Sequence, residues 1–481
     1  MRRDDVMRGA VRRLAAAPLA AVALLALGLA ACGDDKLSVA ELQDPSTCAE
    51  CHPKHHQQWS GSMHAYAADD PVFLAMNKRG QRETNGALGD FCINCHAPMA
   101  KQLGFTDFAN FDPEALPPAA RGITCYFCHN VERVTGTHDN GLVLAGDQTM
   151  RGGVKGATST PAHHSKYDPQ MDGARNQSEI CGSCHDIVVP ASINGRQDVA
   201  LERTFEEWKG TFFSASDDPV LHLTCSGCHM TTSRLEPIAD APGVKPRQFA
   251  FHDHRLAGID LALTPFPEQE AQRAAVREIL DPSVRIVGPA PLIQGNPQPG
   301  GICVTPQDGG IITVRIDSIG VGHSWPSGAS QDRRAWLELI AYDGSGNEVL
   351  KSGIVMPGQD PEVADPNVFG FWDRAFKVDG KVAHFFWDVD RVDSRLLLAP
   401  AVPKQDVSKL ARFPVGASWA TIERVTARFR FNPLPYAMLD ELIASGDLAP
   451  AIRDRVTTLE VGQPTVWLRS TADVGKCGPP N

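Results

Sequence analysis

The sequence predicts a multidomain protein in which a lobe of short helices and irregular chain is followed by an antiparallel β-sandwich. The first observation is length, because 481 residues exceed one ordinary core and suit two domains of about 150–250 residues each. The second is composition, because 42 glycines and 36 prolines are too many for a helical bundle and are typical of loops and turns. The third is a change after Pro265, where β-rich runs separated by turns begin.

These observations divide the chain into five predicted parts. A signal peptide covers residues 1–31 and a tether covers residues 32–46. The irregular lobe covers residues 47–265, a connecting helix and linker covers residues 266–283, and the β-sandwich covers residues 284–475. The lobe has so many loops that it must build its core around something other than its own side chains.

The N-terminal segment is predicted to be a lipoprotein signal peptide. Five arginines lie within residues 1–13, and residues 14–31 form an apolar run rich in Ala and Leu, as in secretory signals. The run ends in Leu-Ala-Ala before Cys32, which resembles a bacterial lipobox and predicts that Cys32 is lipidated. Gly33 stands where an aspartate would indicate inner-membrane retention, which favours the outer membrane. The alternatives are an ordinary signal with a chance cysteine, and a retained transmembrane anchor, for which the run is short.

Ten of the 13 cysteines fall in five Cys-x-x-Cys-His units. Shuffling the same composition would produce on the order of 0.01 such units, so the repetition is not accidental. The rival interpretations of Cys-x-x-Cys are zinc sites and thioredoxin-like redox pairs, and neither requires a following histidine. The five units are Cys48/Cys51/His52, Cys92/Cys95/His96, Cys125/Cys128/His129, Cys181/Cys184/His185 and Cys225/Cys228/His229.

The spacing within each unit is that of c-type haem attachment. Two cysteines three residues apart lie on about one helical turn, so their thiolates reach the two vinyl groups of one porphyrin. The adjacent histidine then gives a nitrogen to the iron. The sequence therefore predicts five covalently bound haems that form much of the core of the lobe. Short helices after each motif, joined by long irregular loops, are the expected structure.

Each iron also needs a ligand on its far side, and the chain has more histidines than that requires. Eleven histidines lie outside the motifs, and nine of them fall in the lobe. For any single one the alternative is a solvated side chain or a hydrogen-bond donor to a haem propionate. Of the neighbours His163 and His164, only one is expected to face an iron. The candidate distal ligands are His64, His138, His164, His222 and His254.

Other side chains are weaker candidates. His55 and His56 are so close to His52 that they could reach only a different haem, and they stay unassigned. Three methionines could ligate iron and raise its potential, but they are interpreted as packing residues. These are Met63, Met99 and Met230.

Charge limits the partners of the protein. The net charge is −11 at pH 7, and removal of residues 1–31 takes away five arginines and two aspartates, which leaves −14. This excludes nucleic acid as the main partner, since polyphosphate binding needs a basic face. The expected partners are other redox proteins of the cell envelope, with basic faces, and the membrane through the lipid anchor. The oligomeric state is not predicted.

Several segments resemble the cytochrome c-554-like multihaem proteins, which are related to electron acceptors of hydroxylamine oxidation. The resemblance covers about residues 47–260 and implies electron transfer through stacked haems with mostly bis-histidine ligation. The chain departs from the tetrahaem pattern in its five motifs and its long C-terminal extension. The marks of the resemblance are the first motif followed by Trp-Ser-Gly-Ser-Met-His-Ala at 59–65, Cys-His-Ala-Pro at 95–98, Gly-Ile-Thr-Cys at 122–125, Ser-Glu-Ile-Cys-Gly-Ser-Cys-His at 178–185, Thr-Phe-Glu-Glu-Trp at 204–208 and Cys-His-Met at 228–230.

We therefore expect an exported, lipid-anchored cytochrome that relays electrons in the bacterial envelope, facing the periplasm or the cell surface. One alternative is a multihaem reductase or oxidase of small nitrogen or sulfur compounds, which requires one haem with an open distal face. Another is a structural conduit that polymerises into a haem filament. The sequence has no Cys-x-x-Cys-Lys variant and no recognisable catalytic constellation, which favours the relay.

The C-terminal half is predicted to be the antiparallel β-sandwich. A connecting helix over 268–280 begins after Pro267 and ends before Pro282. Turns such as Asp-Gly-Ser-Gly-Asn at 343–347 separate the strands. The expected strands are 311–316, 335–342, 349–356, 385–389, 424–431 and 465–469, with a helix at 437–444.

Two features of this half bear on the lobe. The loop Gly-His-Ser-Trp-Pro-Ser-Gly at 322–328 resembles a Gly-His-x-x-Pro-x-Gly loop found beside haem lobes, which makes His323 a distal ligand or an interface contact. The alternative is a structural turn with a hydrogen-bonded histidine. Cys303 and Cys477 either form a disulfide that ties the ends of the domain or are two unpaired thiols.

Overall fold

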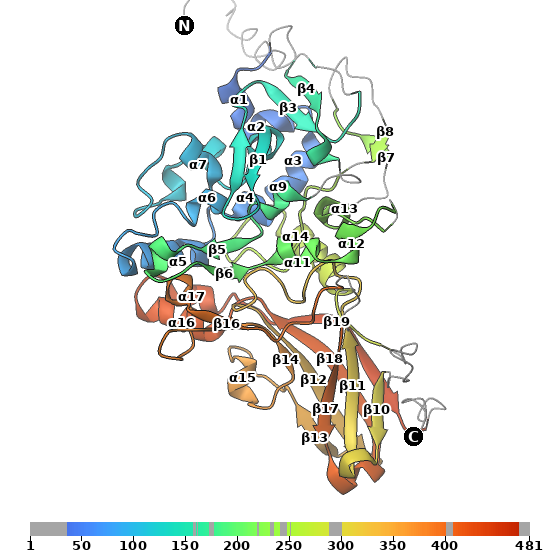
Figure 1. The fold of residues 1–481 in the computed structure, drawn as a ribbon. Coiled ribbons are helices and arrows are strands. Elements are labelled where there is room, and N and C mark those ends of the chain that lie inside the picture. Colours follow the sequence, from blue (N-terminus) through green and yellow to red (C-terminus); the bar gives the residue numbers. More distant parts are fainter. Residues whose placement is uncertain are drawn as a thin grey trace, which may run out of the picture.

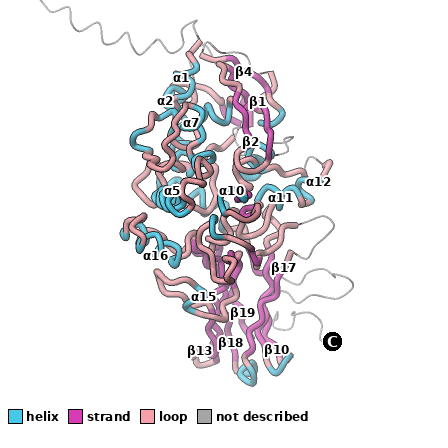
Figure 2. The backbone as a smooth tube through the Cα atoms, turned by 60° about the vertical axis from the view of Figure 1, so that its left-hand side comes forward, coloured by secondary structure: helices cyan, strands magenta, loops and turns pink. Residues whose placement is uncertain are grey.

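The computed structural model has two parts that are stacked along one long axis (Figure 1). Helices and loops dominate the upper part, and long strands run down the lower part (Figure 2). We call the upper part, up to residue 265, the N-terminal lobe, and the rest the C-terminal part. The structure describes residues 36–156, 160, 162–172, 178–218, 221–230, 235–240, 248–250, 252–287, 301–400 and 407–470.

The N-terminal lobe is built mainly from short helices, and each of the five motifs lies in or beside one of them. The many glycines and prolines predict such short helices joined by loops. Only α5 is longer than eight residues among the described helices of the lobe. The helices are α1 (Val39–Gln43), α2 (Pro45–Ala49), α3 (Pro53–Ser60), α4 (Met63–Tyr66), α5 (Pro71–Glu83), α6 (Ile93–His96), α7 (Pro98–Gln102), α8 (Cys125–His129), α9 (Glu179–Gly182), α10 (Ala191–Asn194), α11 (Thr204–Lys209), α12 (Phe212–Ala215) and α13 (Cys225–His229).

Small two-stranded sheets lie between these helices. β1 and β2 form an antiparallel hairpin whose turn holds Asp139 and Asn140 at positive φ, as tight hairpin turns require. β3 and β4 pair in parallel, and the remaining two pairs are antiparallel. The pairs are β1 (Val131–Gly136) with β2 (Gly141–Leu144), β3 (Thr149–Gly152) with β4 (His164–Tyr167), β5 (Ile187–Val189) with β6 (Val199–Glu202), and β7 (Leu235–Pro237) with β8 (Gln248–Ala250).

The expectation of a short helix after every motif is wrong for two motifs. α3 and α7 follow the first and second motifs, but β1 and β5 follow the third and fourth. After the third motif, the buried side chain of Asn130 ends α8 by donating hydrogen bonds to the carbonyl oxygens of Asp147 and Thr149. Val131 then packs with Leu142 of the neighbouring strand, so the chain stays extended.

Two antiparallel sheets make up most of the C-terminal part. One has the order β10-β11-β17 with β9 beside β11, and the other has the order β13-β12-β18-β19 with β14 beside β12. A third pair, β15 with β16, stands apart from them. The strands are β9 (Arg285–Ile286), β10 (Ile302–Thr305), β11 (Ile311–Asp317), β12 (Arg334–Asp343), β13 (Glu348–Ser352), β14 (Gly370–Phe371), β15 (Arg374–Phe376), β16 (Arg391–Asp393), β17 (Ser408–Pro414), β18 (Ile422–Asn432) and β19 (Leu459–Leu468).

The two sheets share one hydrophobic core. Alternate residues of β11, β12 and β18 enter it, because successive side chains of a strand point to opposite faces. Examples are Ile312 and Val314 of β11 and Leu337 and Leu339 of β12, which are all fully buried. A β-sandwich requires two sheets that share one core, and we interpret this arrangement as the predicted sandwich.

The helices of the C-terminal part connect it to the lobe. The predicted connecting helix is α14 (Gln269–Leu280), whose buried Gln272 donates a hydrogen bond to the carbonyl oxygen of Gly61 in the lobe at 3.1 Å. The predicted terminal helix is α16 (Tyr436–Ala444), and α15 (Pro361–Ala364) and α17 (Pro450–Arg453) are single turns. No helix within the described ranges has the length and apolarity to cross a membrane.

Two predicted strands differ from the structure. The segment 385–389 is not a strand but a short 3-10 turn, Phe386–Asp388, because Phe385 and Trp387 stack on each other with ring centres 5.2 Å apart in a buried cluster. The strand predicted at 349–356 ends at Ser352, where Gly353 takes a left-handed φ of 71°.

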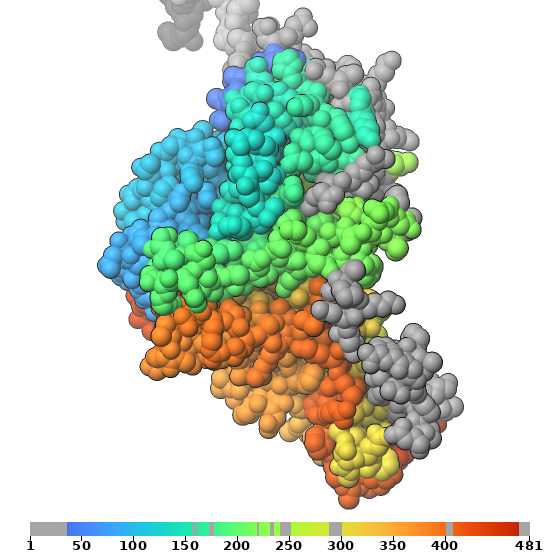
Figure 3. Space-filling model, viewed as in Figure 1, coloured from blue at the N-terminus to red at the C-terminus, as the bar shows by residue number. Residues whose placement is uncertain are grey.

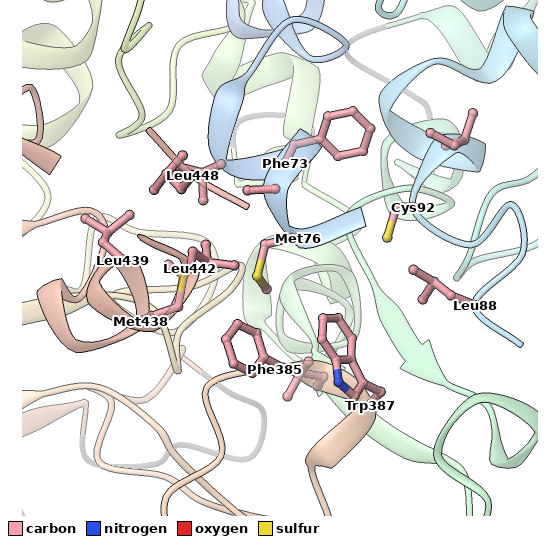
Figure 4. Close-up of a cluster of buried hydrophobic side chains, with 14 of the residues drawn as sticks. Phe73, Met76, Leu88, Cys92, Phe385, Trp387, Met438, Leu439, Leu442 and Leu448 are labelled. Atoms are coloured by element: carbon pink, nitrogen blue, oxygen red, sulfur yellow. The ribbon is translucent and has the colours of Figure 1, made fainter. Parts of the chain in front are cut away.

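One apolar cluster joins the lobe to the C-terminal part, and Figure 4 shows its side chains. Phe73 and Met76 of α5 meet Leu439 and Leu442 of α16 in this cluster. The space-filling view shows the two parts in continuous contact (Figure 3). The cluster is therefore a shared core and not a loose contact between separate domains.

The close approach at Gly353 makes a stability prediction. A Cβ atom there would lie 2.4 Å from the carbonyl oxygen of Leu337, in a backbone conformation that side chains rarely adopt. We expect Gly353→Ala to lower the free energy of unfolding by about 3 kcal/mol. Gly346→Ala is the matched control, because Gly346 also has positive φ but its Cβ would meet nothing within 4 Å, and we expect a cost of about 1 kcal/mol. Equal denaturation midpoints for the two variants would contradict the prediction.

Candidate haem-binding site

One connected cavity, lined by all five motifs, lies in the lobe and extends to the C-terminal part. Its volume is about 1600 Å³, which exceeds the roughly 300–1,000 Å³ of an ordinary ligand pocket. All ten motif cysteines and all five motif histidines lie on its wall. The space is therefore of the size and chemistry that several covalently attached groups need, and not that of one small ligand.

Local capping fixes the start of two motif helices. The hydroxyl oxygen of Thr124 accepts a hydrogen bond from the backbone N–H of Phe127 and so caps α8. Thr224 caps α13 in the same way through the N–H of Gly227 at 2.9 Å. In both cases the residue after the cap is the first cysteine of the motif, so the cap sets where the one-turn helix that spaces the two thiols begins.

Four of the five motif histidines are oriented by backbone carbonyl oxygens. A carbonyl oxygen only accepts, so each Nδ1 in such a bond carries the proton, which leaves Nε2 free to bind a metal ion. The acceptors are the carbonyl oxygens of Ile238 for His52 at 2.6 Å, Ala67 for His96 at 3.3 Å, Arg151 for His129 at 2.6 Å and Ala257 for His229 at 2.8 Å.

Three motif histidines face a second histidine ring across the cavity. Two imidazoles that bind one metal ion from opposite sides, through bonds of about 2 Å, have ring centres about 6 Å apart. The residues present therefore fit an iron with two axial histidines at three places. The ring centres are 6.2 Å apart for His64 and His185, 6.2 Å for His129 and His254, and 6.5 Å for His229 and His323, and the ring planes are 37°, 20° and 13° apart.

His64 is held in place by the third motif segment. Its carbonyl oxygen accepts a hydrogen bond from the N–H of Ile123 at 2.9 Å, and the Trp59 indole donates to the carbonyl oxygen of Ile123 at 2.8 Å. Gly122 makes this approach possible, because a Cβ there would lie 2.5 Å from the His64 carbonyl oxygen. The segments 59–65 and 122–125, which carried the family resemblance, thus fit together to position one imidazole.

His323 reaches the lobe on a loop from the C-terminal part. Trp325 of this loop is buried in the core of the two sheets, where its ring centre lies 5.6 Å from that of Phe371. On the lobe side, the Glu207 carboxylate of α11 accepts hydrogen bonds from the Ser324 N–H at 3.2 Å and the Ser327 hydroxyl at 2.6 Å. The loop is therefore clamped from both sides, and it presents His323 to His229.

Burial keeps the facing imidazoles neutral. Loss of hydration, together with the neighbouring histidines, lowers the pKa of His64 to about 3 and the pKa values of His185 and His254 to about 4. Burial also lowers the pKa of His323. The neutral imidazole is the form that binds iron.

His52 and His96 have different surroundings. The His55 ring lies 5.9 Å from the His52 ring but stands edge-on to it, at 80°. Phe73 stacks on His96 with ring centres 4.3 Å apart and planes 1° apart, which is too close for an iron between them. The structure describes all 16 histidines, and none of them pairs with His96 in the manner of the three facing pairs.

The candidate distal histidines divide into two groups. His64 and His254 line the cavity and face motif histidines. The other three do not line it: His138 is exposed and its Nδ1 lies 2.9 Å from an Asp139 carboxylate oxygen, His164 is exposed in β4, and His222 lies in the segment before α13. Among the methionines, Met63 and Met230 line the cavity, whereas Met99 is buried in a separate apolar cluster.

His163, and not His164, lies on the cavity wall. Neighbouring residues of extended chain point to opposite sides, so only one of the two can face inward. His163 lies near His52 and His129, both of which lower the pKa of its ring. Its Nδ1 donates a hydrogen bond to the carbonyl oxygen of His164 at 3.1 Å. The sequence carries no signal for which of the two faces inward, because both sides of this short strand are polar.

Residues 47–130 match the family described as cytochrome c554 and c-prime. This segment contains the first three motifs, and the cavity around it carries the other two. The family match and the five motifs on one cavity wall together support a multihaem c-type cytochrome.

A solved structure has a similar fold. The match is to the crystal structure of a penta-heme cytochrome c552 from Thermochromatium tepidum, with a TM-score of 0.57 and 18% sequence identity, and it covers 90% of this chain and 99% of that one. No match is found among curated proteins. At this identity the likeness shows the fold, which includes both the lobe and the C-terminal part of the cytochrome.

Cysteines of different motifs lie close to one another. The thiol of Cys125 is near enough to Cys48 to lower its pKa, and the thiols of Cys225 and Cys95 are near enough to raise the pKa values of Cys181 and Cys184. The electrostatic influence of Cys128 reaches both Cys181 and Cys184. The third motif is therefore next to the first and the fourth, and the fourth is next to the second and the fifth.

Three predicted features involve residues outside the described ranges. These are the signal peptide, the lipidation site Cys32 and the disulfide partner Cys477. Cys303 itself is disulfide-bonded and buried. Its pairing with Cys477 and the lipidation of Cys32 stay predictions.

The facing pair of His323 and His229 gives a spectroscopic test. We expect His323→Ala to leave every haem attached and to convert one haem from low spin to high spin, because one iron loses an axial imidazole. Electron paramagnetic resonance of the oxidised protein measures this change. His384→Ala is the control, since His384 bonds to the Glu441 carboxylate at 2.7 Å and does not line the cavity. The same spectrum for wild type and His323→Ala, with the fold intact, would return His323 to the role of a structural turn residue.

Proposed function

We propose that this cytochrome carries five haems and relays electrons between redox proteins of the bacterial cell envelope. The observation that carries the proposal is the closeness of cysteines of different motifs inside one cavity. Because each cysteine pair would hold one haem, cysteines of different motifs that lie close together would bring their haems near enough to exchange electrons. Haem c, when bound, supplies one-electron redox chemistry, and the chain supplies its position and surroundings.

The ligand set that we propose follows from the facing rings. His185 would share an iron with His64, His129 with His254, and His229 with His323. We assign His163 to the iron of His52, because its ring lies on the cavity wall within the electrostatic influence of His52. Axial imidazoles on both sides close these irons to small molecules, which suits a carrier of electrons.

The proposed route of electrons ends at the fifth motif. Cys228 is the one exposed cysteine among the ten, so the haem edge that it holds would be the most accessible from outside. The net charge of −11 favours a partner with a basic face. We propose a basic envelope redox protein as the partner at this edge, and a lipid on Cys32 as the attachment to the outer membrane.

A second candidate function is favoured by the surroundings of His96. No histidine faces His96, and Phe73 stacks on its ring, so the iron at this motif has no imidazole on its far side. An iron with a free axial position is what a reductase or oxidase of small nitrogen or sulfur compounds requires. The alternative thus rests on one named motif, Cys92/Cys95/His96.

The number of haems is the first test. Thioether bonds are covalent, so we expect the denatured mature protein to retain five haems, which intact mass spectrometry counts. A mass with four haems or fewer in fully matured protein would contradict the proposal.

The same preparation separates the two functions. A fully low-spin spectrum, with no carbon monoxide bound after reduction, would support the relay alone. One high-spin haem that binds carbon monoxide would support the enzyme, and turnover of a small nitrogen or sulfur compound would then be measured.

Membrane attachment makes a further prediction. We expect Cys32→Ser to move the protein from the membrane fraction to the soluble fraction, because the lipid chains supply the membrane affinity. Fractionation of cells with detection of covalent haem measures the distribution. The wild-type protein serves as the control, and a soluble wild type whose N-terminus is a residue other than 32 would show that the lipoprotein interpretation is wrong.

A further inference from the structure

Glu202 lies where the lobe meets the C-terminal part. It is the last residue of β6, which runs along the lower edge of the lobe, directly above the C-terminal part (Figures 1 and 3). Its side chain lines the haem cavity. β6 pairs with β5, which follows the fourth motif, so the strand that carries Glu202 is fixed to a haem-bearing segment.

The Glu202 carboxyl has no hydrogen-bond or ion-pair partner among the described residues. The charged groups around it come from three other elements of the fold. Arg333 and Asp332 precede β12, Asp260 lies in the segment before α14, and Asp186 follows the fourth motif. The Arg333 charge is already balanced, because its two terminal nitrogens donate to the Asp260 carboxylate at 2.6 and 2.8 Å.

This environment places the protonation of Glu202 near neutrality. Burial raises the pKa of Glu202 to about 7, Arg333 opposes the rise, and the three aspartates add to it. Two other cavity carboxyls, Asp70 and Asp332, have pKa values raised by burial to about 6. Both have partners, since Asp70 accepts from the N–H groups of Val72 and Phe73, and Asp332 accepts from the Gln331 amide.

We propose that Glu202 couples electron transfer in this cavity to proton uptake. The proposal rests on the proposed electron-transfer function. When an envelope donor delivers one electron to a ferric iron of the cavity, the Glu202 carboxylate takes one proton from solvent and becomes a neutral carboxyl. On oxidation by an acceptor, the electron leaves and Glu202 returns the proton. Each complete step adds or removes one electron and one proton, so the buried cluster keeps its charge.

The physical reason is the cost of adding charge to a buried and already acidic cluster. An added electron raises the pKa of a neighbouring carboxyl, because two like charges in a poorly solvated site repel strongly. Arg333 cannot absorb this charge, since Asp260 already neutralises it. Glu202 has no partner that holds it ionised, so it is the group that responds.

The protonation state of Glu202 sets how the midpoint potential of the nearby haem depends on pH. Below about pH 7 Glu202 is already protonated in the oxidised protein, so the midpoint potential of the nearby haem is independent of pH there. Above that pH, reduction must take up a proton, and the midpoint potential falls as the pH rises. When one proton is taken up with one electron, the midpoint potential falls by at most about 59 mV per pH unit. One pH unit is a tenfold change in proton concentration, and for a one-electron couple a tenfold change corresponds to this potential.

The test is a spectroelectrochemical titration of the full-length protein with all its haems at several pH values. In wild type, we expect one haem potential to fall with pH above neutrality. Glu202→Gln mimics the protonated carboxyl, so this haem should keep its low-pH potential at every pH, whereas Glu202→Asp should retain the dependence. Glu338→Gln is the matched control, because Glu338 of β12 is also shielded but pairs with Arg428 and Arg430 of β18.

Two outcomes would overturn the proposal. One is a wild type whose potentials do not change with pH above neutrality. The other is a Glu202→Gln protein that keeps the wild-type pH dependence while it retains its haems and its fold. Either result leaves the electron-transfer function intact as long as the haems are reduced and reoxidised, whereas failure of the haems to accept electrons would contradict that function itself.

Discussion

The N-terminal lobe is organised by covalent attachment sites that lie within single helical turns. Each Cys-x-x-Cys-His unit fixes two thiols and one imidazole in a few residues, and all five units open onto one cavity of about 1600 Å³. The short helices, the loops and the many glycines and prolines follow from this constraint, because the chain has to cover large apolar groups and not its own side chains. The only α-helix of more than eight residues in the described lobe, α5, packs on the C-terminal part and also lines the cavity through Phe73 and Met76.

The orientation of the imidazoles depends on the backbone more than on other side chains. Carbonyl oxygens accept from Nδ1 of His52, His129 and His229, so the nitrogen that faces the cavity is the unprotonated one. Burial also lowers the pKa values of His129 and His229, which keeps the same nitrogen of these two rings unprotonated. Hydrogen bonds to the backbone thus orient these imidazoles independently of a bound metal ion.

The C-terminal part contributes to the site in addition to covering it. Trp325 anchors the 322–328 loop in the core of the two sheets, Glu207 holds the same loop from α11, and His323 between them faces His229. Arg333 and Asp332 of the same part surround Glu202 of the lobe. Together with the apolar cluster of α5 and α16, these contacts bring residues of both parts to the wall of the cavity at their boundary.

The sequence by itself determined the attachment sites, because thioether chemistry needs only a local spacing that any reader of the chain can see. It also indicated the change from helices to antiparallel strands, since β-rich runs and turn residues are local signals. It could not show that segment 385–389 turns, because three consecutive aromatic residues read equally well as a strand. Only the tertiary structure decided which histidine faces which motif, that His163 points inward and His164 outward, and that Glu202 lies without a partner among charges from distant segments. Those outcomes depend on contacts between residues far apart in the chain, and local pattern carries no information about such contacts.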